Sequence, residues 1–102
     1  MATESAEETA VGKRWVEETV KRLGSEYKID ATDFKWRDDF PGPYISTLAF
    51  DPGKPNQTGS IEFRVRHLED CRNPNNRPVR VALEQQIRDS LQELSRRLGQ
   101  AR

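Results

Sequence analysis

The chain contains one short segment rich in possible metal ligands, His67-Leu68-Glu69-Asp70-Cys71. Imidazole, carboxylate and thiolate groups are the usual ligands of zinc. Structural zinc sites usually combine two ligand pairs from separate parts of a chain, and the sequence has no second pair at suitable spacing. The pattern therefore favours a polar strand end with Cys71 as a small, partly buried residue, and we expect no metal and no other cofactor. His67 and Cys71 stay as candidate ligands of one alternative, a small metal-dependent enzyme.

Other catalytic chemistry has little basis in the sequence. Asp38 and Asp39 are adjacent carboxylates, but such a pair acts as general acid and base only when burial or mutual repulsion shifts a pKa. They border the turn Phe40-Pro41-Gly42-Pro43, where Asp side chains commonly accept hydrogen bonds from nearby backbone N–H groups. The sequence also lacks a phosphate-binding loop, a dinucleotide fingerprint and a nucleophile elbow. We therefore expect no catalytic residue and no enzymatic activity.

A third group of residues is brought together by strand alternation. Successive residues of a strand point to opposite faces of a sheet. Three segments alternate in this way, and on one predicted face they place four cations and one anion around small and β-branched residues: Lys35, Arg37, Arg64, Arg66 and Glu62 around Ile45, Thr47 and Ala49. Such a face could bind an acidic peptide or a phosphate backbone. The simpler alternative is an ordinary solvated face of an antiparallel sheet.

The strands that position this face are predicted from their alternation and from turn residues. We expect strands over residues 33–37, 44–50 and 61–66, separated by the turn after Phe40 and by a polar loop over residues 51–59. Short connections indicate an antiparallel meander with the second strand in the centre. The other face of this sheet is apolar, and its residues are Phe34, Trp36, Leu48, Phe50, Ile61, Phe63 and Val65.

The first predicted helix spans Ser5 to Leu23. Ser5 and Glu8 form a capping box, and Gly24 is a typical stop signal. Gly12 should weaken the helix by about 1 kcal/mol relative to Ala. Its apolar stripe consists of Val11, Trp15, Val16, Val20 and Leu23.

The second predicted helix begins near Pro78 and ends at Gly99. Three pairs of opposite charges four residues apart, Arg80/Glu84, Glu84/Arg88 and Glu93/Arg97, should stabilise its outer surface. The apolar stripe consists of Val79, Ala82, Leu83, Ile87, Leu91, Leu94 and Leu98. Its last two leucines extend beyond a small sheet, which makes a dimer seam an alternative to packing within the chain.

These elements predict an α+β fold. We expect a two-layer sandwich of α-β-β-β-α order, in which a three-stranded antiparallel meander packs both helices on one face. Residues 5–99 should form a single domain, flanked by a flexible N-terminal tail over residues 1–4 and a C-terminal tail over residues 100–102.

The element order resembles that of double-stranded RNA-binding domains. Such domains contact RNA through the first helix, the loop between the first two strands and the basic start of the last helix. Here Gly42-Pro43 lies in that loop, and Arg77 and Arg80 lie at the start of the last helix. Tyr44-Ile45 stands where the family has a histidine, and a lysine cluster is absent. The resemblance implies nucleic-acid binding as an alternative function.

Composition limits the partners further. The chain has 17 Lys+Arg and 17 Asp+Glu, so its formal net charge is zero, which argues against a dedicated nucleic-acid or membrane-surface protein. The charges are nevertheless separated, because residues 1–51 carry 7 positive and 11 negative charges and residues 52–102 carry 10 and 6. An acidic start without a signal-peptide pattern, a lone cysteine and no long apolar run predict a cytoplasmic protein.

Together these observations predict a small non-enzymatic binding module. Its partner should be another protein, or a second copy in a homodimer, and we expect no membrane interaction. The candidate binding residues are Lys35, Arg37, Arg64, Arg66, Arg77 and Arg80.

Overall fold

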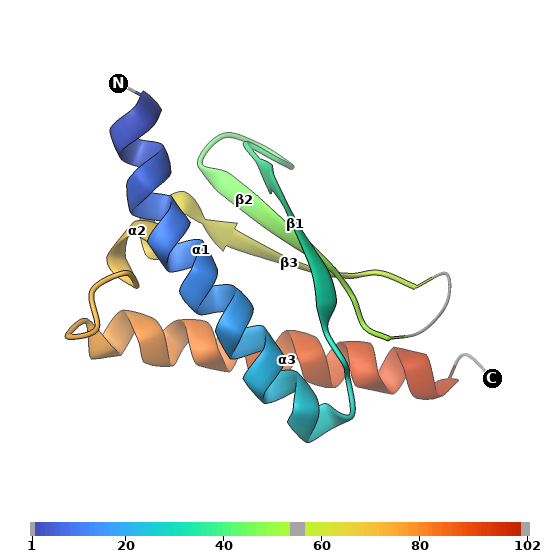
Figure 1. Cartoon of the computed structure of the whole chain (residues 1–102). Coiled ribbons are helices and arrows are strands. Elements are labelled where there is room, and N and C mark those ends of the chain that lie inside the picture. The colour runs from blue at the N-terminus through green and yellow to red at the C-terminus, as the bar shows by residue number, and fades with distance from the viewer. Residues whose placement is uncertain (1, 54–56, 101–102) are drawn as a thin grey trace.

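The computed structural model describes residues 2–53 and 57–100, arranged as a helical layer against a sheet (Figure 1). The structure confirms the predicted fold class, with one additional short helix before the last helix. None of the helices within the described residues is long and apolar enough to cross a membrane. The elements in chain order are α1 (Ala2–Gly24), the 3-10 turn η1 (Ser25–Tyr27), β1 (Thr32–Asp38), β2 (Ile45–Asp51), β3 (Gly59–Arg64), α2 (Val65–Asp70) and α3 (Arg77–Gln100).

The three strands form the predicted antiparallel meander, with β2 in the centre. The register places Trp36 beside Leu48 and Leu48 beside Ile61, so the apolar residues of all three strands share one face. On that face Leu48, Ile61 and Phe63 are at most 3% exposed, and Trp36 is half-buried. The apolar face of the sheet is therefore the floor of the core.

Both long helices cover this same face. Residues Val16, Val20 and Leu23 of α1 are completely buried, and so are Ile87 and Leu91 of α3. Each apolar side chain buried in this way contributes about 1.5–3 kcal/mol to the free energy of unfolding. The predicted apolar stripes are correct along most of their length, but Val11 is 54% exposed and Ala82 is also exposed. Ala82 instead lines a surface groove with His67 and Leu83.

The structure corrects the predicted end of the third strand. Residues 65 and 66 do not continue β3, because Val65–Asp70 forms the short helix α2. The alternation of Ile61, Phe63 and Val65 hides this change. Leu68 and Cys71 follow Val65 at intervals of three, a helical spacing, and both are completely buried. Burial of these two side chains is the reason why the chain turns from strand to helix here.

The predicted helix ends also change. Helix α1 begins at Ala2, so Ser5 lies inside the helix and is not its N-cap, and part of the predicted tail is helical. Helix α3 begins at Arg77 and continues through Gly99 to Gln100. The interior position of Gly99 means that it does not act as the predicted stop signal.

Gly12 allows α1 and α2 to touch backbone to backbone. A Cβ atom at this position would overlap the carbonyl oxygen of Leu68 and would lie 3.1 Å from the Cys71 sulfur. The Cys71 thiol donates a hydrogen bond to the Leu68 carbonyl (3.4 Å) and a longer one to the Gly12 carbonyl (3.7 Å). The low helix propensity of Gly12 is thus offset by a contact that only glycine permits.

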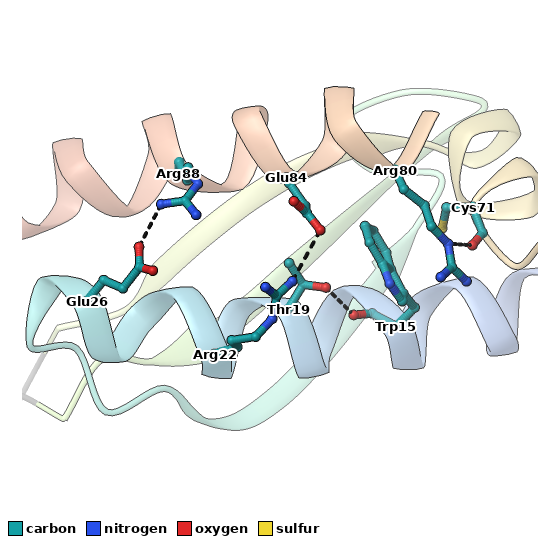
Figure 2. A network of polar contacts seen from close by, with 8 residues as sticks. All are labelled: Trp15, Thr19, Arg22, Glu26, Cys71, Arg80, Glu84 and Arg88. Carbon is teal, nitrogen blue, oxygen red and sulfur yellow. Dashed lines mark hydrogen bonds and ion pairs between the residues drawn. The ribbon is translucent and has the colours of Figure 1, made fainter. Parts of the chain in front are cut away.

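Charged side chains join α1 and the turn η1 after it to α3 (Figure 2). Arg22 pairs with Glu84 at 3.2 Å, and Glu26 pairs with Arg88 at 2.6 Å. The expected pairs Arg80/Glu84 and Glu84/Arg88 within α3 are therefore replaced by pairs between helices, because α1 lies close enough to supply the partners. Near the end of α3, Glu93 pairs with Arg96 rather than with Arg97.

The end of α3 belongs to the core of the single chain. Leu94 is 4% exposed, and it lies so close to Gly59 of β3 that a Cβ there would be 2.9 Å from the leucine side chain. Leu98 is partly buried against the same core. The chain's own sheet therefore occupies Leu94, and the predicted alternative of a dimer seam is left with Leu98 and stays a prediction.

The contact at Gly12 yields a test of the fold. We expect Gly12→Ala to lower the free energy of unfolding by about 3 kcal/mol, because the new methyl group forces α1 and α2 apart. Gly99→Ala is the matched control: a Cβ at Gly99 has nothing within 4 Å, so the variant should be as stable as the parent or slightly more stable. Urea denaturation followed by circular dichroism measures both. Equal stability of the two variants would contradict the close approach.

Candidate functional site

The face of the sheet turned away from the helices is the candidate site, and we call it the open sheet face. The register places Lys35 beside Ala49, Arg37 beside Thr47, and Ile45 beside Arg64. Two rows of charge therefore border the centre strand β2, one on β1 and one on β3. The open sheet face consists of Lys35, Arg37, Glu62 and Arg64 around Ile45, Thr47 and Ala49, with Asp51 at the end of β2 near Lys35.

The cations of this face differ in their surroundings. Lys35 and Arg64 are exposed, and their side chains form neither a hydrogen bond nor an ion pair with any residue that the structure describes. The guanidinium of Arg37 lies 3.8 Å from the centre of the Phe40 ring, a cation–π contact. Thr47 Oγ1 donates a hydrogen bond of 2.7 Å to the Phe40 carbonyl. The loop after β1 thus holds Arg37 in place and leaves Lys35 and Arg64 free.

Arg66 does not belong to the open sheet face, although the sequence predicted it there. It lies on α2 and lines a hollow of about 570 Å³ together with Arg64 and Tyr44. Glu69 and Asp70 line the same hollow and balance its charge. Sequence reasoning missed Tyr44, which is 80% exposed and has a positive φ of 64°. The position of this aromatic residue directly after a Pro-Gly-Pro turn could have indicated that it is exposed.

Arg77 and Arg80 lie in the helical layer, away from the open sheet face. Arg80 Nε donates a hydrogen bond of 2.8 Å to the Cys71 carbonyl, and its guanidinium lies 5.0 Å from the centre of the Trp15 ring (Figure 2). This contact satisfies a carbonyl group at the end of α2. Arg80 therefore joins α2 and α3, whereas Arg77 is exposed at the start of α3.

The side chains of His67 and Cys71 contact different parts of the molecule. The Cys71 thiol is buried against α1, and burial raises its pKa from an ordinary value of 9.0 to about 11. His67 instead lines an apolar groove of about 220 Å³ with Val79 and Leu83 of α3. Among the residues that the structure describes, no three His, Cys, Asp or Glu side chains come together in a way that could hold a metal ion.

Asp38 has a structural partner and does not pair with Asp39. It accepts hydrogen bonds of 2.8 Å from Lys13 Nζ and from Ser46 Oγ. These two hydrogen bonds hold the pKa of Asp38 below its ordinary value, so the carboxylate stays ionised at neutral pH. The contact links α1 to the end of β1.

Comparisons of the chain with protein-family models, with curated proteins and with solved structures gave no match. The resemblance of the element order to double-stranded RNA-binding domains gains no support from them. The helix α2 also separates β3 from α3.

The buried thiol predicts a pH dependence. In the folded chain Cys71 keeps its proton up to about pH 11, whereas in the unfolded chain it releases the proton near pH 9. The native state therefore binds more protons between these values, and the free energy of unfolding falls as pH rises through this range, by about 2 kcal/mol. Below pH 9 the buried Cys71 thiol makes its full contribution to the free energy of unfolding.

Urea denaturation of the parent and of Cys71→Ala at several pH values between 8 and 11 measures this effect under reducing conditions. Lysine and tyrosine titrations affect both proteins equally, so the difference between the two slopes reports Cys71 alone. Parallel slopes would contradict a buried thiol of raised pKa.

Proposed function

We propose that the chain is a non-enzymatic binding module that recognises an acidic segment of another protein through the open sheet face. One observation carries this proposal. At the border of the helices, Arg22 and Arg88 are matched to acids of the same chain, Glu84 and Glu26. On the open sheet face, Lys35 and Arg64 have no such partner among the described residues. Their charge is available to a second molecule.

The shape of the face suits a polypeptide. Ile45 and Ala49 are half-buried and Thr47 is 7% exposed, so the centre of the face is lined by short side chains between longer charged ones. A bound segment can rest on this centre while its carboxylates reach Lys35 and Arg64. Glu62 repels an acidic side chain at one corner, which favours one orientation of the segment.

Nucleic acid and a second copy fit the face less well. Strong binding to a phosphate backbone takes many lysine and arginine contacts, and this face offers three cations with two acids, Glu62 and Asp51, among them. Two copies meeting through this face would bring like charges together. An acidic protein segment satisfies the cations without either difficulty.

Charge reversal tests the proposal with an oligo-glutamate peptide as the probe. We expect Lys35→Glu/Arg64→Glu to weaken peptide binding by about tenfold or more while the fold stays intact, because both residues are exposed. Arg14→Glu/Arg97→Glu is the matched control, since it changes net charge equally at exposed helical positions. Titration of the isotope-labelled proteins by NMR measures affinity and locates the contact.

Equal loss of binding in the two double variants would overturn the proposal, because net charge and not the open sheet face would then explain the affinity. Tighter binding to double-stranded RNA than to the peptide, in a gel-shift assay at several salt concentrations, would also overturn it.

A further inference from the structure

The two edges of the sheet differ in how they are closed. At the β3 edge, Gln86 of α3 donates a hydrogen bond from Nε2 to the Glu62 carbonyl. At the other edge β1 pairs with β2 alone, and none of the described residues supplies a hydrogen bond to the outer backbone side of β1. An unpaired strand edge is a template for a further strand.

The hydrogen-bond pattern shows which β1 residues face outward. Val65 N–H donates to the Tyr44 carbonyl, and antiparallel partners alternate between bonded and non-bonded pairs. Ser46 and Leu48 therefore bond to β3, which leaves the backbone groups of Thr47 and Ala49 for β1. The outward position of the Glu62 carbonyl agrees with this alternation.

The β1 partners of Thr47 and Ala49 are Arg37 and Lys35. Because these two residues bond inward to β2, the backbone N–H and C=O groups of Phe34 and Trp36 point out of the sheet at the free edge.

We propose that the acidic partner binds as a fourth strand along the free edge of β1, and that its sequence alternates acidic with apolar residues. This inference rests on the proposed function and specifies the recognition. Side chains on one face of the added strand would lie beside Lys35 and Arg37, which calls for carboxylates. Side chains on the other face would lie beside Phe34 and Trp36, which calls for apolar groups.

Side chains of the core and of α1 pack against the aromatic residues of this edge. Phe34 and Trp36 are half-buried, and their rings lie 6.1 Å from Phe50 and 5.9 Å from Phe63, so they are fixed by the core. Lys13 Nζ lies 5.3 Å from the Trp36 ring centre and Lys21 Nζ 5.5 Å from the Phe34 ring centre. The free edge therefore has rigid aromatic rings with two lysines of α1 beside them on the helical face, and Lys35 and Arg37 on the open sheet face.

The backbone limits the length of the added strand. Asp33 has a positive φ of 51°, and the pairing of β1 with β2 shifts register between Thr32 and Lys35. At the other end Asp39 also has a positive φ, of 54°. The straight edge thus runs from Phe34 to Asp38, about 17 Å, which suits a short motif.

A second copy of β1 is a poor occupant of this edge. Pairing of two β1 strands would bring Lys35 and Arg37 of one copy next to the same cations of the other, and like charges on neighbouring strands are destabilising. The cations therefore protect the edge from self-association, and they favour a segment of opposite charge.

The test uses capped synthetic peptides in which glutamates alternate with valines. In an antiparallel added strand the valine N–H groups face β1 and the glutamate N–H groups face solvent. We expect N-methylation of the valines to weaken binding by about tenfold or more, and N-methylation of the glutamates to have little effect. The reverse preference would indicate a parallel strand on the same edge and would also support the proposal.

Charge variants show whether the peptide binds at the free edge of β1 or elsewhere on the open sheet face. Lys35→Glu/Arg37→Glu should abolish binding of the glutamate peptide and gain binding of a peptide with lysines in place of glutamates. Arg14→Glu/Arg97→Glu is the control, since it changes the net charge equally at exposed helical positions and should change affinity by less than about threefold. NMR titration with amide hydrogen exchange should show protection at Phe34 and Trp36.

Two failures are distinguishable. If the peptides bind with equal affinity whichever set is N-methylated, and the shifts spread over Ile45, Thr47 and Arg64, edge addition is overturned and the proposed function stands. If neither these peptides nor oligo-glutamate binds at millimolar concentration, both are overturned.

Discussion

The arrangement of the helical layer depends on the backbone contact between α1 and α2 at Gly12. Because Gly12 has no side chain, α2 lies directly against α1, and Leu68 and Cys71 reach the core. Arg80 then bonds to the carbonyl of Cys71 and sets the start of α3 against the end of α2. With its start held there, α3 runs beside α1, where the ion pairs between these helices form. A side chain at Gly12 would disturb each of these steps in turn.

The same packing decides where charge remains available. A chain with equal numbers of acids and bases can still have a cationic surface when its acids are used elsewhere. Here Glu26 and Glu84 meet arginines at the border of α1 and α3, and Asp38 meets Lys13. These exposed pairs contribute little to stability. Their consequence is electrostatic, because these three acids are paired on the helical side of the sheet and form no ion pair with Lys35 or Arg64.

Much of the fold was predictable because it follows from local periodicity. The alternation of Phe34 with Lys35 and the leucine stripe of α3 each identify an element and its buried face. The features that could not be predicted depend on contacts between distant segments. The helix α2 was missed because Val65 continues the alternation of β3, and the open sheet face lost Arg66 for this reason. Pairs such as Arg22–Glu84 are invisible to reasoning that considers one helix at a time. Gly12 lowers the stability of an isolated helix. It stabilises the fold only through the close contact with α2, which a single helix does not reveal.

The asymmetry of the two sheet edges follows from the chain order. The last strand, β3, continues directly into α2 and then α3, so a side chain of α3 is at hand to close its edge through Gln86. The first strand, β1, follows α1, whose side chains reach Phe34, Trp36 and Asp38 from the helical side of the sheet and not in the plane of the strand. An open edge of this kind exposes a protein to unwanted pairing unless charge or a bulge discourages it. β1 has both, in Lys35 and Arg37 and in the strained backbone at Asp33. The positive charges of Lys35 and Arg37 repel only positively charged segments. The same two cations that keep β1 from pairing with itself therefore select a negatively charged segment for this edge.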